Sequence, residues 1–333
     1  MAASRSLRYE FGYPTINLFA ARDAMQVGVD KPTGNNTGIV SGFSRTVVTG
    51  DTTITATGDQ SWYHYDFYGR LKFNSSGQKY FRNCRFFGNS ALTTSTGAVD
   101  CTNSAVTSII IEDSTFFPGA SQYNDCIIGW NYTLRRCNLQ HGVDGCGVNP
   151  PSTATANGVT IEMCYFDNFA WFNPSAGQSD GSHSDGIQIQ GGSGASIRGN
   201  YFNGYFDTSI GNSPWSRNTA YYSSTIGSDP LYHSLSNIQI TPNISPVTGC
   251  TIDSNWCFGA EIGINASKSN NSGNNIGTIT NNRFGHDQFI GVNGKAATPS
   301  NLPVQVLMNS GSTWTASGNV FDDTSAAITF HSV

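Results

Sequence analysis

Residues 160–166 read TIEMCYF, and the same spacing of side-chain types returns along most of the chain. A large apolar residue, Ile161, is followed by a charged one, Glu162. A small residue, Cys164, and an apolar one, Phe166, then follow at intervals of two. The charged position of this motif alternates in sign over six successive occurrences, at Arg82, Glu112, Arg135, Glu162, Arg198 and Asp253. Only 12% of the chain is charged, so the alternation indicates residues that stack on one another in successive coils.

A second recurring segment alternates apolar and polar residues with a period of two, which is the pattern of a β-strand. It appears at Leu71 and Phe73, Ile187 and Ile189, Ile238 and Ile240, Ile262 and Ile264, and Val304 and Val306. The segments are short and punctuated by Gly, Asn and Ser, and leucine is sparse, which disfavours helical and leucine-rich repeats. The sequence therefore predicts stacked parallel strands, with at least two strands in each coil.

We predict an all-β protein, a right-handed parallel β-helix (a solenoid), over residues 46–325. Long loops are expected at residues 167–184 and 203–236, and a C-terminal end at 326–333. Residues 1–45 lack the repeat and are expected to form a cap or an attachment segment, with a short helix within PTINLFAARDAMQV, residues 14–27. The repeat resembles the pectate-lyase-like superfold, which hosts lyases, hydrolases, bacteriophage tailspikes and adhesins.

Composition excludes several classes of function. The net charge of −5 argues against a nucleic-acid partner, and without a run of about 18 apolar residues we expect no membrane insertion. The first residues, MAASRSLRYEFGYP, lack the apolar core of a secretory signal, so none is expected. The eight cysteines include Cys84, Cys137 and Cys164 at the motif position that Ser114 and Asn200 occupy elsewhere, which predicts buried thiols rather than disulfides.

Three aspartates begin the second strand in consecutive coils: Asp125 (DCIIG), Asp144 (DGCGV) and Asp185 (DGIQI). Adjacent carboxylates in such a column lie about 5 Å apart and alternate ones about 10 Å apart, which brackets the separations in retaining and inverting glycosidases. Mutual repulsion should raise at least one pKa. His141 and His183 precede Asp144 and Asp185 and are possible proton-transfer groups. The catalytic candidates are Asp185, Asp144, Asp125 and His183.

A structural role for the same aspartates is an open alternative. Asp144-Gly145 and Asp185-Gly186 are typical of turns, in which the carboxylate accepts backbone amides and the glycine takes a positive φ.

The two long loops adjoin the Asp185 coil and are rich in aromatic residues, which are suited to stacking on sugar rings. The substrate-binding candidates are Trp171, Phe172, Asp180, Tyr205, Trp215, Tyr221, Tyr222 and His141. The alternative is that these aromatic side chains only pack their own loops. Oxygen ligands for Ca²⁺ exist at Asp144, Asp180 and Asp185, but no ligand spacing supports a site, so we expect no metal and no cofactor.

The segment HSDGI, residues 183–187, resembles the Asn-Thr-Asp-Gly stretch of polygalacturonase-type hydrolases. That family adds an Asp-Asp pair one coil later and a Gly-His-Gly beyond it. The next coil here reads SLSNIQI, residues 234–240, so the active site of that family is not carried over.

The architecture also resembles a bacteriophage tailspike or minor tail protein. That resemblance implies a place in the virion, an N-terminal segment docked to other tail proteins, a host cell-envelope glycan bound by loops near Asp185, and a homotrimer. There are two alternatives. One is a glycan depolymerase, that is, a glycoside hydrolase that uses paired aspartates, and the other is a cellular carbohydrate-active enzyme. We favour binding without catalysis, because hydrolysis additionally requires two correctly aimed acids.

Overall fold

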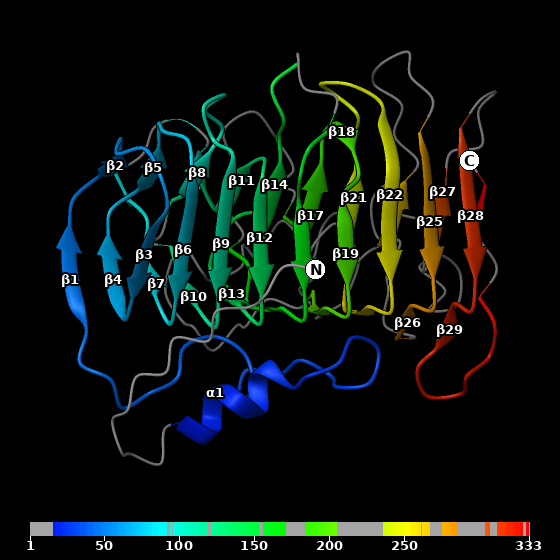
Figure 1. Cartoon of the computed structure of the whole chain (residues 1–333). Coiled ribbons are helices and arrows are strands. Elements are labelled where there is room, and N and C mark those ends of the chain that lie inside the picture. The colour runs from blue at the N-terminus through cyan, green and yellow to red at the C-terminus, as the bar shows by residue number, and fades with distance from the viewer. Residues whose placement is uncertain are drawn as a thin grey trace, which may run out of the picture.

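The chain winds as a right-handed parallel β-helix in which each coil contributes one strand to each of three sheets (Figure 1). The computed structural model describes residues 16–91, 94, 96–118, 121–152, 156–170, 184–204, 236–260, 262–266, 275–285, 304–306, 312–328 and 331–332. Within these ranges the secondary structure is almost all strand, and one helix, α1, spans Ile16–Asp23. The predicted fold class is confirmed.

The sheets are named A, B and C, and the chain passes through them in the order C, A, B within each coil. Sheet A contains β1 (Thr46–Thr49), β4 (Tyr65–Tyr68), β7 (Arg85–Phe86), β10 (Thr115–Phe116), β13 (Asn138–Leu139), β16 (Tyr165–Phe166), β20 (Tyr201–Asn203), β23 (Trp256–Phe258), β26 (Arg283–Phe284) and β29 (Val320–Phe321). Sheet B contains β2 (Thr52–Ile54), β5 (Leu71–Phe73), β8 (Thr96–Cys101), β11 (Asn124–Gly129), β14 (Cys146–Val148), β17 (Asp185–Ile189), β21 (Ser236–Ile240), β24 (Ile262–Ala266), β27 (Val304–Val306) and β30 (His331–Ser332). Sheet C contains β3 (Gln60–Tyr63), β6 (Gln78–Arg82), β9 (Ser108–Glu112), β12 (Tyr132–Arg135), β15 (Thr160–Glu162), β19 (Ser196–Arg198), β22 (Val247–Asp253), β25 (Ile276–Thr280) and β28 (Thr313–Ser317), with β18 (Gly192–Ser193) paired to β22.

The charge ladder lies on sheet C in the register that the sequence predicts. Its strand partners are Arg82 with Glu112, Glu112 with Arg135, Arg135 with Glu162, Glu162 with Arg198, and Arg198 with Asp253. Arg135 lies 3.2 Å from Glu112 and 3.3 Å from Glu162. Because the Arg135 side chain is 43% exposed, each such pair contributes under about 1 kcal/mol to stability. The ladder therefore indicates the register of the strands but contributes little to its stability.

Arg82 departs from the expected pairing, although Glu112 is its strand partner. Its Nε donates to Asp113 at 2.8 Å and its guanidinium also reaches Asp23 at 2.8 Å. Glu112 instead accepts the hydroxyl of Tyr80 at 2.9 Å.

The turn from sheet C to sheet A is a single residue with positive φ, between 46° and 69°, in nine coils: His64, Asn83, Asp113, Arg136, Met163, Gly199, Ser254, Asn281 and Gly318. Only two of these are glycines, so the others hold a left-handed conformation that side chains disfavour. After eight of these nine turns, all except the one at His64, the next residue is a small side chain that points into the coil. It is Cys84, Ser114, Cys137 or Cys164 in earlier coils and Asn200, Asn255, Asn282 or Asn319 in later ones.

The buried asparagines at this position bond each coil to the next. Asn255 Oδ1 accepts both the backbone N–H and the side-chain amide of Asn200, each at 3.0 Å. Its own Nδ2 donates to Ile197 O at 3.0 Å and to Asn282 Oδ1 at 2.9 Å. Each amide is thus satisfied only when the coils are in register.

The cysteines are free and buried, as the sequence predicts for packing thiols. Burial raises the pKa of the Cys84 thiol to about 12, so it stays protonated at neutral pH.

Residues 19–45, which we call the strap, run across the coils along the corner between sheets C and A, below the stack in Figure 1. Gly38 N donates to Arg136 O at 2.8 Å. Val40 N donates to Asn83 Oδ1 at 2.7 Å, and Asn83 Nδ2 donates back to Val40 O at 3.1 Å.

The strap reaches both early and late coils. Arg45 bonds to Asp66 of β4, and Lys31 lies 3.8 Å from Asp322, which follows β29. These residues therefore cover a side of the stack, which is not the position that the expectation of an end cap implied. At the other terminus β30 lies within the segment expected to be the C-terminal end, and it pairs with β27.

The predicted N-terminal helix is present as α1, and its last turn holds a cluster of opposite charges. Asp23 lies 2.8 Å from Arg82 and 2.9 Å from Arg136. The enclosed carboxylate of Asp113 lies 2.8 Å from Arg82 and 2.9 Å from Arg136, with Arg22 at 4.0 Å. The enclosed Asp113 thus joins the two arginines, and α1 is held to them through Asp23, whose side chain is 48% exposed.

We expect Asn255→Ala to lower the free energy of unfolding by about 2–4 kcal/mol, because it removes the side-chain bonds to Asn200, Ile197 and Asn282 and takes away the acceptor of the buried Asn200 backbone N–H. Chemical denaturation measures this. Asn74→Ala is the control, since Asn74 is exposed and its change should stay within about 0.5 kcal/mol. Equal effects would show that the asparagine ladder does not stabilise the stack.

We expect Gly38→Ala to loosen the strap, because Gly38 has φ of 72° and an added Cβ would lie 2.7 Å from Thr115 Oγ1. Gly58→Ala is a matched control, because Gly58 has φ of 80° but nothing within 4 Å. Hydrogen exchange over residues 24–45 should rise at least about tenfold in the first variant and stay near wild type in the second. Unchanged exchange in both would contradict the packing of the strap.

Candidate functional site

The structure brings Asp125, Asp144 and Asp185 together as a column on three consecutive coils. Asp144 N donates to Asp125 Oδ1 at 3.2 Å, and Asp185 N donates to Asp144 Oδ1 at 2.8 Å. Cys126 N donates to Asp144 O at 2.9 Å and Gly145 N to Asp185 O at 3.0 Å, which continues the ladder of sheet B. Each bonded carboxylate thus accepts an amide from the next coil rather than from its own turn.

The side chains of Asp125 and Asp144 lie on the outside of the coil, whereas Asp185 is 1% exposed. Asp125 and Asp144 are half-buried, whereas the residues that point into the same coils are fully enclosed. An added Cβ on Gly145 would lie 2.8 Å from the ring of Phe166, a core residue, so Gly145 faces inward and Asp144 faces the other way.

The glycines after Asp144 and Asp185 are required by packing rather than by a turn. Neither Gly145 nor Gly186 has a positive φ. An added Cβ on Gly186 would lie 2.7 Å from the ring of Phe202. The Asp-Gly pairs therefore do not form the turn that the structural alternative assumed.

The pKa values of two carboxyl groups of the column, Asp125 and Asp144, are raised. Burial raises the pKa of Asp144 to about 7, and the amide of Asp185 opposes this shift. Burial, followed by the nearby charge of Asp144, raises the pKa of Asp125 well above its usual range. A pair of this kind holds a proton near neutral pH, as a general acid must.

Further polar groups lie beside the column on sheet B, and the sequence analysis did not single them out. Gln188 alternates with the buried Ile187 and Ile189, so it points outward. Gln190 follows with the same parity, and its Nε2 donates to Gln188 Oε1 at 2.6 Å. The signal was present in the sequence as the polar positions of the repeated IQIQ pattern.

Trp130 and Asn149 occupy the position of Gln190 in two other coils. Gly129, Val148 and Ile189 are strand partners, so the residues that follow them are equivalent. All three side chains are half-buried. The indole N–H of Trp130 donates to Asn103 O at 3.1 Å. The outer face of sheet B thus carries carboxyl, amide and indole groups in three neighbouring coils.

Of the remaining predicted site residues, only His141 lies within the described part of the chain. His141 is 3% exposed and its ring lies 3.7 Å, between centroids, from the ring of Phe117. The following candidates lie outside the described residues: His183, Trp171, Phe172, Asp180, Tyr205, Trp215, Tyr221 and Tyr222.

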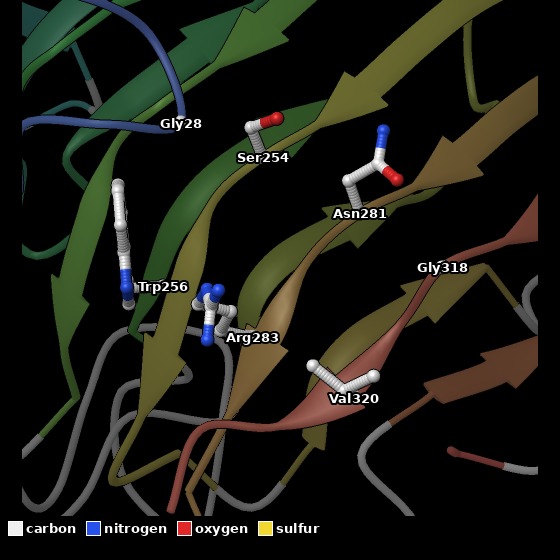
Figure 2. A pocket seen from close by; sticks show the side chains of 7 residues that line it. All are labelled: Gly28, Ser254, Trp256, Asn281, Arg283, Gly318 and Val320. Carbon is white, nitrogen blue, oxygen red and sulfur yellow. The ribbon is translucent and has the colours of Figure 1, made fainter. Parts of the chain in front are cut away.

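A separate hollow of about 190 Å³ lies where the strap crosses the last coils, as Figure 2 shows. It is lined by Gly28, Ser254, Trp256, Asn281, Arg283, Gly318 and Val320. Ser254 and Asn281 both donate to Asp253, at 3.1 and 2.9 Å, and Arg283 lies 3.4 Å from Asp322. Because its polar groups already bond within the protein, this hollow is a poorer candidate site than the column.

The geometry defines a parallel β-helix with an outward column of acidic side chains. Comparison with protein families, with curated proteins and with solved structures finds no match for the chain. Within the described ranges, no group of three metal-ligating side chains is placed to hold an ion. No helix in those ranges has the length and apolar character needed to cross a bilayer.

The raised pKa values predict a loss of stability with rising pH. A carboxyl whose pKa is raised by folding contributes its full stability below the unfolded value near 3.9, and this contribution is lost as the pH rises through about 7. Between pH 5 and pH 8 the free energy of unfolding should fall in the wild type and fall by about 1–2 kcal/mol less in Asp144→Asn, after allowance for the partial exposure of Asp144. Urea denaturation at the two pH values measures this.

Asp100→Asn serves as the control for this experiment. Asp100 lies on the same sheet but bonds to Thr96 and Thr102, so its replacement should leave the pH dependence of stability as in wild type. Identical pH profiles for Asp144→Asn and wild type would contradict a raised pKa at Asp144.

Proposed function

We propose that this chain is a bacteriophage tail protein, of the tailspike or minor tail kind, that recognises host cell-surface glycan on the outer face of sheet B. The observation that carries the proposal is the set of half-buried polar and aromatic groups on three neighbouring coils. This recognition face consists of Asp125, Asp144, Trp130, Asn149, Gln188 and Gln190.

The chemistry of the face suits sugars. Side-chain amides offer both donors and acceptors, and carboxyl groups offer acceptors, so together they match the hydroxyl groups of a glycan. The Trp130 indole adds an apolar surface that a sugar ring can cover. Coils spaced about 4.8 Å apart repeat these groups along the stack, which favours an extended chain over a compact ligand.

The virion assignment rests on the likeness of the β-helix to tailspikes, a fold that also carries other functions. Under this proposal the N-terminal segment docks to other tail proteins, the protein works as a homotrimer, and its location is the virion. The strap fits a docking role because it fastens the N-terminal segment across many coils.

Hydrolysis of the bound glycan is the second candidate, and the raised pKa of Asp144 favours it. With a pKa of about 7, Asp144 retains a proton that it can give to a leaving oxygen. The pKa of Asp125 is raised as well, and Asp185, which is 1% exposed, is the remaining carboxyl group of the column.

The test is to incubate the purified protein with bacterial capsular and O-antigen polysaccharides and to measure binding and new reducing ends. We expect binding without products, and a loss of affinity of about five- to tenfold in Gln188→Ala, because one hydrogen-bonding group is removed. Gln78→Ala is the control, since Gln78 is exposed on sheet C.

The outcomes separate the two candidates. If new reducing ends form with the wild type and disappear in Asp144→Asn and Asp185→Asn, the protein hydrolyses the glycan, and the proposal of recognition without catalysis is wrong. Absence of both binding and products across the panel would overturn the proposal.

A further inference from the structure

The arrangement of charge around the recognition face carries an inference about the glycan. Successive strands of sheet B present Lys72, Asp100, Ile128, Gly147 and Gln188 along one column. With about 4.8 Å between strands, Lys72 lies about 10 Å from Ile128 and about 19 Å from Gln188. Asp100 lies between Lys72 and Ile128 in this column. At physiological ionic strength the charge of Lys72 is largely screened at the distance of Gln188.

The arginines of the coils that carry the recognition face lie on another part of the stack. Between residues 124 and 266, the described part of the chain contains Arg135, Arg136 and Arg198 and no lysine. All three belong to sheet C or its corner with sheet A, and they pair with acidic residues there. The guanidinium groups that would bind a ligand carboxylate are therefore committed to the scaffold.

The two long connections next to the recognition face also lack an excess of positively charged residues in their sequences. The segment between β16 and β17 includes residues 171–183, which contain Asp180 and no lysine or arginine. The segment between β20 and β21 includes residues 205–235, which contain Arg217 against Asp207 and Asp229. Neither connection brings a net positive charge.

We infer that the recognition face takes an uncharged glycan and rejects polysaccharides that bear carboxylate or phosphate groups. This inference rests on the proposed glycan recognition. A ligand carboxylate placed beside Asp125 and Asp144 would meet like charge whenever the pair is ionised. Arg70 reaches Thr96 on the neighbouring strand β8, but it is already paired with Asp51 at 3.5 Å. Hydroxyl and acetamido groups instead match the paired amides of Gln188 and Gln190.

The experiment uses pairs of polysaccharides that differ only in charge. Each acidic capsular polysaccharide is tested beside the same polymer after its uronic carboxyl groups have been chemically reduced to primary alcohols, together with naturally neutral O-antigens. Binding of the full chain is measured by calorimetry at pH 8. We expect neutral polymers to be bound, and at least one reduced polymer to bind at least about tenfold more tightly than its acidic parent.

A variant with an added positive charge provides a second readout. Gln188→Lys places a cation on the recognition face and should narrow the preference for the reduced polymer by at least about fivefold. Gln78→Lys adds the same charge on sheet C and should leave the preference unchanged.

Equal or tighter binding of the acidic parents would overturn the inference while leaving glycan recognition intact. Binding of no polymer in the panel, neutral or acidic, would overturn the proposed function itself.

Discussion

The amide of Asn255 bonds to the coil before it and to the coil after it, and contacts of this kind hold the register on which the other features depend. An asparagine in this position is fully bonded only when its neighbours are at the same height in the stack. The charge ladder on sheet C and the carboxylate column on sheet B are consequences of that register. The ladder is visible in the sequence because it lies outside. The buried amides enforce the order from Asn200 to Asn319, whereas cysteine or serine occupies the same position in the coils before Asn200.

The sequence predicted the stacking because charge and residue size repeat at one position of each coil. Arg135 between Glu112 and Glu162 is the clearest case, since strand spacing alone brings opposite charges together. The column of Asp144 and Asp185 was predictable for the same reason. What could not be predicted was the direction of their side chains, because this depends on the inward packing of the glycines that follow.

Other features escaped prediction because they depend on contacts between distant segments. The strap has no repeat of its own, and its place along the corner follows from partners such as Asn83 and Arg136 that the sequence does not link to it. The pairing of Arg82 with Asp113 likewise depends on α1, which brings Asp23 to the same corner. Gln188 has neither a charge nor an aromatic ring to distinguish it in the sequence, and its place on the outer face follows only from the buried Ile187 and Ile189 on either side.

The strap also changes what kind of folding unit the stack is. In a solenoid each coil contacts only its neighbours, so stability is a sum of local terms and an end can fray alone. Contacts from Arg45 at Asp66 to Lys31 at Asp322 join coils that share no strand pairing. A coil at the edge cannot leave without breaking its bonds to the segment that also holds the others. A chain built from repeats thereby gains the cooperativity of a globular domain.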